Sequence, residues 1–133
     1  MSQQNVEVVR RWYDLFQRGA WESAVGDADP EIEIIEPQGV VGSRRYHGHE
    51  GLVEALRAWP SHWDDFQVEL VQIIDPGTDQ VVSLTRHHAR GKGSGVEVER
   101  ELAYLITFRD AKAIRWEMFL TLAEALEAAG LSE

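Results

Sequence analysis

The segment that decides the fold reads VEVERELAYLITF (96–108), RDAKA (109–113), IRWEMF (114–119) and LTLAEALEAAGL (120–131). Alternation of apolar and polar residues predicts β-strands over 96–108 and 114–119, joined by a tight turn. The Ala, Leu and Glu residues of 120–131 predict a short amphipathic helix. A strand, a turn, a strand and a terminal helix in this order indicate an antiparallel sheet with helices packed against it.

The upstream chain adds further helices and strands. Apolar residues recur at helical spacing in three segments and alternate in three others, with Gly or Pro between them. The predicted elements are helices over 3–18, 21–25 and 50–59 and strands over 32–36, 66–75 and 81–89. This order predicts an α+β fold with a strongly curved, antiparallel-rich sheet. Helices packed on its concave face would leave a cone-shaped cavity.

Length and composition limit the possible functions. A chain of 133 residues has the size of one domain, so residues 1–133 are expected to form a single domain. The formal net charge of −10 opposes binding to a nucleic acid. No apolar run reaches the roughly 18 residues that a membrane-spanning helix needs. The absence of Cys and of a signal-like start predicts a cytoplasmic protein.

The histidine pairs and the Gly-rich segment do not indicate a cofactor. His47 and His49 open a helix, and the adjacent His87 and His88 point to opposite faces of a strand, so neither pair is expected to share a metal ion. Residues 91–95 join two strands and match neither a dinucleotide fingerprint nor a P-loop. We therefore expect no metal and no organic cofactor.

Alternation along the strands predicts which side chains face the cavity. In each strand the face that carries most apolar residues is expected to face the core. The polar members of these faces are Glu36, Arg86, His88, Tyr104 and Glu117. A single β-bulge would exchange His87 for His88. Arg86 and Glu117 have two interpretations, a catalytic pair or a structural ion pair.

Several short motifs carry a family resemblance. They are Val9–Phe16 before Gly19, Glu36-Pro37, Gly48–Leu52, Gly93–Val96, Phe108-Arg109-Asp110 and Glu124–Leu131. In this order they resemble the nuclear transport factor 2-like superfamily, in its SnoaL-like polyketide cyclase and ketosteroid isomerase-like branch, over nearly the whole chain. The resemblance implies a cone-shaped roll and a homodimer through the outer face of the sheet. Relatives usually have Gly in the turn after the Arg-Asp pair, where this chain has Ala111-Lys112-Ala113, which predicts a non-Gly residue at positive φ in this turn.

The resemblance also implies acid/base chemistry without a cofactor. In ketosteroid isomerases a carboxylate directly before Pro transfers the proton, and Glu36-Pro37 matches that place. Trp12 stands where that family has its oxyanion-hole Tyr, and Tyr104 where it has a protonated acid, so true ketosteroid isomerase activity is not expected. SnoaL-like cyclases use one acid/base residue, a role that His88 or Glu117 would fill. Limonene epoxide hydrolases hold an Arg between two carboxylates, which Arg86 with Glu117 and Glu36 resembles loosely.

The expected ligand is a small, largely apolar molecule. The substrate-binding side chains are predicted to be Trp12, Tyr13, Phe16, Trp59, Tyr104 and Phe119. Many members of the superfamily are not enzymes, so a ligand-binding or dimerisation module is the alternative to an isomerase or cyclase. Nothing in the sequence separates isomerisation, cyclisation and hydration, since each needs one base, one donor and an apolar cavity.

Overall fold

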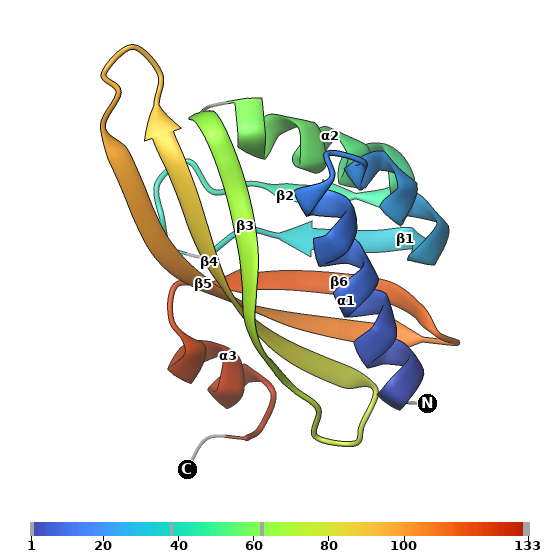
Figure 1. The fold of residues 1–133 in the computed structure, drawn as a ribbon. Helices are drawn as coiled ribbons and strands as arrows, with labels where there is room; N and C mark the ends of the chain where they lie inside the picture. The colour runs from blue at the N-terminus through green and yellow to red at the C-terminus, as the bar shows by residue number, and fades with distance from the viewer. Residues whose placement is uncertain (1, 38, 62, 132–133) are drawn as a thin grey trace.

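The computed structural model describes residues 2–37, 39–61 and 63–131, which form a mixed six-stranded sheet with helices on both of its faces (Figure 1). The elements are α1 (Ser2–Gln17), the 3-10 helix η1 (Trp21–Asp27), β1 (Ala28–Ile35), β2 (Arg45–His47), α2 (Gly48–Ser61), β3 (Trp63–Ile74), β4 (Gln80–Gly91), β5 (Glu97–Arg109), β6 (Lys112–Phe119) and α3 (Leu122–Ala128). The predicted α+β fold is confirmed. None of the described helices is long and apolar enough to cross a membrane.

The strands follow the order β2-β1-β6-β5-β4-β3. All neighbours are antiparallel except β1 and β6, which run parallel and bring Ile34 opposite Trp116. No element was predicted between the strand over 32–36 and the helix over 50–59, but Arg45–His47 forms a short strand that pairs with β1. Three residues carry too short a pattern for periodicity to detect, so only the partner strand defines this element.

The helices divide between the two faces of the sheet. Val9 and Trp12 of α1 and Leu56 of α2 pack on the concave face, as predicted. The terminal helix α3 differs from the prediction because it packs on the opposite face, where Ala125 contacts a cluster that includes Val82 and Leu105. The central strands are therefore buried on both faces, and alternation of polarity cannot indicate which face is concave.

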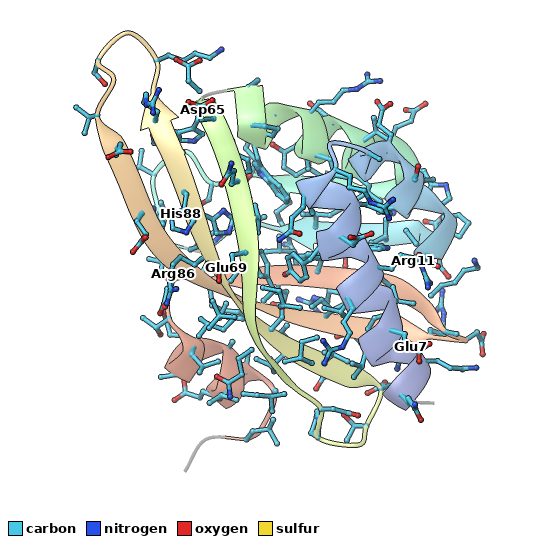
Figure 2. All side chains as sticks on the ribbon, viewed as in Figure 1. Glu7, Arg11, Asp65, Glu69, Arg86 and His88 are labelled. Carbon is cyan, nitrogen blue, oxygen red and sulfur yellow. The ribbon has the colours of Figure 1, made fainter. Side chains whose placement is uncertain are left out.

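The pairing of β4 with β5 corrects the predicted orientation of Arg86 and His88. Tyr104 lies opposite Ser83, and paired residues of neighbouring strands project to the same face. Ser83, Thr85 and His87 therefore share the concave face with Tyr104. The prediction that Arg86 and His88 face the cavity is wrong, because both alternate to the outer face. Figure 2 shows these two side chains close to Glu69.

A β-bulge corrects the predicted orientation of Glu117 and Phe119. Next to the turn, Phe108 pairs with Ala113, but Thr107 pairs with Arg115, so one extra residue is accommodated in β6. The shift places Met118 opposite Tyr104, where a regular hairpin would place Glu117. A one-residue shift exchanges the two faces of a strand, so Glu117 and Phe119 lie on the outer face.

The turn that joins β5 and β6 contains the predicted non-Gly residue at positive φ. Asp110 has φ of 53° and Ala111 has φ of 64°, the backbone of a two-residue turn that favours Gly at its second position. Ala111 is exposed, so its methyl group gains no burial energy there.

Ala111→Gly is expected to raise the free energy of unfolding by about 0.5–1 kcal/mol. Glycine adopts the positive φ of this turn without the steric strain that the Ala111 Cβ causes. This gain exceeds the loss of stability that comes from the greater backbone freedom of Gly in the unfolded chain. Urea denaturation measures the change. Ala123→Gly, at an exposed position of α3, is the matched control and is expected to lower stability. A loss of stability in both variants would contradict the strain argument.

Candidate functional site

A cavity of about 370 Å³ opens on the concave side of the sheet, between the end of β1, α2 and strands β3 to β6. Its walls are mainly aromatic and aliphatic. The largest of these side chains are Trp59, Trp63, Phe66, Leu102, Met118 and Leu120. The charged and titratable side chains among the described lining residues are Glu36, His87, Arg100 and Tyr104. A small apolar body with one or two polar groups matches this lining.

Glu36 lies in the cavity wall, where the sequence analysis expected it. It directly follows β1, and Pro37 prevents the strand from continuing. One carboxylate oxygen accepts a hydrogen bond from Trp59 Nε1 at 2.7 Å, and the other accepts from the backbone N–H of Arg44 at 2.9 Å. Two donors from different elements therefore hold the carboxylate in one orientation, and each oxygen keeps a lone pair for a ligand.

A second polar group forms where β4 and β5 meet. His87 Nε2 lies 3.0 Å from Thr85 Oγ1 and 3.0 Å from the Tyr104 hydroxyl. Thr85 Oγ1 in turn donates to the backbone carbonyl of Leu102 at 3.0 Å. Phe66 covers the imidazole, with 5.7 Å between ring centroids. Side chains of three strands thus fix the position of His87 and Tyr104.

The hydrogen bonds of this group define the tautomer of His87. The single hydroxyl proton of Thr85 is donated to Leu102, so the contact with Nε2 requires a proton on that nitrogen. The Nε2–H is then shared between the oxygens of Thr85 and Tyr104. This arrangement leaves a lone pair on Nδ1, and the Tyr104 O–H can donate to Thr85 Oγ1 or to a ligand.

Burial keeps both side chains neutral at neutral pH. Desolvation lowers the pKa of His87 to about 4, and the positive charge of Arg100 and the neighbouring His88 act in the same direction. Burial also raises the pKa of Tyr104. The hydroxyl of Tyr104 therefore remains a hydrogen-bond donor, and His87 remains uncharged.

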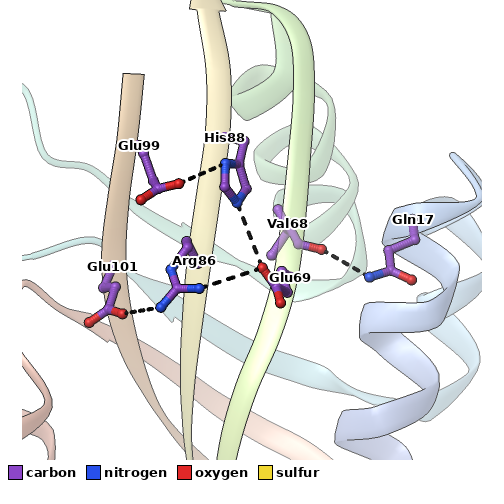
Figure 3. A network of polar contacts seen from close by, with 7 residues as sticks. All are labelled: Gln17, Val68, Glu69, Arg86, His88, Glu99 and Glu101. Carbon is purple, nitrogen blue, oxygen red and sulfur yellow. Dashed lines mark hydrogen bonds and ion pairs between the residues drawn. The ribbon is translucent and has the colours of Figure 1, made fainter. Parts of the chain in front are cut away.

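Arg86 and His88 belong to an exposed polar network on the outer face (Figure 3). Arg86 pairs with Glu101 at 3.0 Å and lies 3.8 Å from Glu69. His88 lies 3.2 Å from Glu99. Arg86 therefore does not pair with Glu117, and neither Arg86 nor His88 reaches the cavity.

Glu117 is also separated from the cavity. It lies 3.3 Å from Arg115 Nε, two residues away on the same face of β6. Glu36 and Glu117 line a separate, smaller cavity of about 250 Å³, but Arg86 pairs with neither of them, so the arrangement of an epoxide hydrolase is not formed. Among the described residues, no group of three or more His, Cys, Asp and Glu side chains is placed to hold a metal ion.

The predicted substrate-binding residues divide into two groups. Trp59 and Tyr104 line the cavity. Trp12 and Tyr13 lie in the packed core. Trp12 stacks on Trp116 with 4.5 Å between ring centroids, and the Tyr13 hydroxyl forms a hydrogen bond of 3.0 Å with Ser83 Oγ. Phe16 packs at the edge of the same core, and Phe119 packs beside α3 on the outer face.

The sequence analysis did not identify Phe66, Arg100 or Met118 as site residues. Arg100 and Met118 share a face with Tyr104. Alternation along β5 could have identified Arg100, and the pairing of β6 with β5 could have identified Met118. His87 was the alternative that one bulge would select. The correct pairing of β5 with β4 and β6 places His87 and Met118 on the cavity side.

The family profile of the SnoaL-like domain matches residues 9–116. The chain belongs to the SnoaL-like domain family. No curated protein sequence matches the chain.

Solved structures with this fold include proteins crystallised with small molecules. TerC, co-crystallised with polyporic acid, is 23% identical, with a TM-score of 0.75 over 93% of this chain and 96% of TerC. An NTF2-like protein from Burkholderia thailandensis is 22% identical, with a TM-score of 0.78 over 96% and 95% of the two chains. A ketosteroid isomerase-like protein from Catenulispora acidiphila, in complex with trimethylamine, is 14% identical, with a TM-score of 0.74 over 94% and 93%. These likenesses establish the fold.

The depressed pKa of His87 makes stability depend on pH. In the unfolded chain a His titrates near pH 6.5, so between about pH 6.5 and about pH 4 the unfolded state binds more protons. The contribution of His87 is complete above pH 6.5 and is lost as pH falls. From about pH 7.5 to about pH 5 this loss is expected to reach about 2 kcal/mol.

Urea denaturation of the wild type and of His87→Gln at both pH values measures the effect, and the variant is expected to lose less stability on acidification. His47→Gln, at an exposed His, is the control and is expected to behave like the wild type. An equal loss in the wild type and in His87→Gln would show that His87 is not buried as a neutral group.

Proposed function

We propose that the protein binds a small, largely apolar carbonyl compound in the cavity and transfers a proton on it, as an isomerase or cyclase without a cofactor. The observation that carries this proposal is the placement of a carboxylate, Glu36, and a neutral donor, Tyr104, in the wall of one apolar cavity. A base and a donor in water-poor surroundings are the requirements for removal of a proton next to a carbonyl group.

Exposed apolar side chains support an apolar ligand. Among the described residues, five large hydrophobic side chains are exposed, and three of them, Val40, Val41 and Leu120, line this cavity. Val41 is fully exposed, at 101%. Contiguous exposed apolar surface often marks a binding site in a protein that is otherwise well covered.

Each polar residue has a defined role in the proposed reaction. A Glu36 oxygen takes the proton from the carbon next to the carbonyl, and the electron pair of that C–H bond moves to the carbonyl oxygen. The O–H of Tyr104 donates a hydrogen bond to the enolate oxygen and keeps its proton. Return of the proton from Glu36 to another carbon gives an isomer. Attack of the enolate carbon on a second carbonyl group forms a C–C bond and closes a ring, and the new alkoxide takes the proton from Glu36.

A non-catalytic binding module is the alternative. The same cavity would then bind a ligand without exchanging its protons, and Glu36 would serve as a hydrogen-bond acceptor. Relatives of the same fold crystallised with polyporic acid or trimethylamine are consistent with either function. An assay that detects proton removal separates the two.

Solvent exchange of a carbon acid tests proton transfer without knowledge of the natural substrate. In D₂O, the protein is expected to accelerate loss of the α-proton NMR signals of β-tetralone, an apolar bicyclic ketone. Glu36→Gln is expected to reduce this acceleration by about 10²–10⁴-fold, the usual contribution of a general base. Tyr104→Phe is expected to reduce it by a smaller factor because the enolate oxygen loses one donor.

Glu127→Gln removes an exposed carboxylate from α3 and is the matched control, with the wild-type rate expected. Binding of β-tetralone with no accelerated exchange would support the binding module. Wild-type exchange in Glu36→Gln would remove Glu36 from the mechanism.

We also propose a cytoplasmic homodimer that associates through the outer face of the sheet beside α3. This face carries Arg86 next to Glu69 and Glu101. A surface with mixed charges is self-complementary about a two-fold axis, because an acid of one copy can face a base of the other.

Analytical ultracentrifugation at micromolar concentration is expected to give the mass of a dimer. Arg86→Glu is expected to shift the mass toward the monomer. Arg57→Glu, at an exposed position of α2, is expected to leave the mass of the dimer unchanged. A monomeric mass for the wild type would rule out this interface.

A further inference from the structure

The cavity contains a cation with no acidic partner. Arg100 is exposed at the open end of β5, on the same face as Val98, Leu102 and Tyr104, and it lines the cavity. It is the only Lys or Arg among the described lining residues. The ion pairs found among the described residues do not include it.

The acidic neighbours of Arg100 in β5 and the carboxylate of the cavity wall have other partners. Glu99 and Glu101, the neighbours of Arg100 in β5, project to the outer face and pair with His88 and Arg86. Glu36, the one carboxylate of the described lining, accepts hydrogen bonds from Trp59 and from the backbone of Arg44. Arg100 is therefore the one cation in the described lining, and no ion pair among the described residues neutralises it.

The groups beside Arg100 are suited to an anion. His87 is its cross-strand partner, and Arg100 and the Tyr104 hydroxyl lie on one face of β5. Arg100 supplies a charged donor with several N–H groups, and Tyr104 supplies a neutral O–H. Aromatic and aliphatic side chains, among them Trp63 and Phe66, form the adjacent wall.

We propose that the ligand of this cavity is an aromatic or alicyclic acid whose carboxylate or acidic enol oxygen binds the guanidinium of Arg100. The apolar body of the acid lies against the aromatic wall, with its reactive carbon toward Glu36. The inference rests on the proposed function, since it specifies the ligand of the same cavity. It adds a requirement for negative charge, which an apolar cavity by itself does not impose.

A matched pair of probes tests the requirement for charge. β-Naphthoate and β-naphthamide have the same rings and nearly the same shape, but only the first is an anion. By isothermal titration calorimetry at neutral pH and low salt, the wild type is expected to bind the naphthoate about two- to fivefold more tightly, the effect of one exposed ion pair. Added salt is expected to reduce the preference.

Arg100→Gln is expected to remove the preference while the naphthamide binds as in the wild type, and Arg100→Lys is expected to keep part of it. Lys92→Gln removes the same charge from the turn of the same hairpin, outside the cavity, and is expected to keep the full preference. Equal binding of the two probes, or a preference that survives in Arg100→Gln, would overturn the anion inference and leave the proposed cavity function standing. Binding of neither probe by the wild type would overturn both.

Discussion

Tyr104 lies in the middle of β5, opposite Ser83 on β4 and Met118 on β6, and the other cavity side chains are placed relative to it. Its ring packs edge-on against Trp116 with 5.6 Å between centroids, and Tyr13 of α1 lies 6.4 Å away. The same residue therefore joins the aromatic core under α1 to the polar group of the cavity. A shift of one residue in either pairing would exchange the concave and outer faces of a strand.

Two adjacent histidines of β4 have different surroundings because they project to opposite faces. His87 is held between hydroxyl groups under an aromatic ring, where loss of a hydrogen bond leaves a polar atom unsatisfied in an apolar setting. His88 lies in a solvent-exposed network of carboxylates and Arg86, where water and salt weaken each contact. The chemistry of the cavity depends on which member of the pair faces inward.

Most of the fold could be predicted from the sequence, because helices and long strands carry strong periodicity and Gly or Pro marks their ends. The predicted strand over 96–108 corresponds to β5, and its Leu102, Tyr104, Ile106 face is the concave one. The orientation of β4 and β6 could not be predicted in the same way. Val81 and Val82 are both fully buried, since α1 lies over one face and α3 over the other. The bulge between Ala113 and Arg115 has no sequence signal of the kind that Gly provides in a turn. Of the predicted site residues, Glu36, Trp59 and Tyr104 line the cavity, whereas those of β4 and β6, whose faces polarity does not distinguish, lie on the outer face.

The parallel pairing of β1 with β6 has a consequence for synthesis of the chain on the ribosome. β1 and β2 form early, but the strand that joins them to the rest of the sheet is the last one made. About 80 residues separate the two partners, which takes several seconds at about 5–20 residues per second. During that interval β1 has β2 as its strand partner and α2 packed against it, but its other edge is unpaired. The nascent chain therefore exposes this strand edge until β6 emerges, a period in which chaperone binding or association with another chain competes with folding.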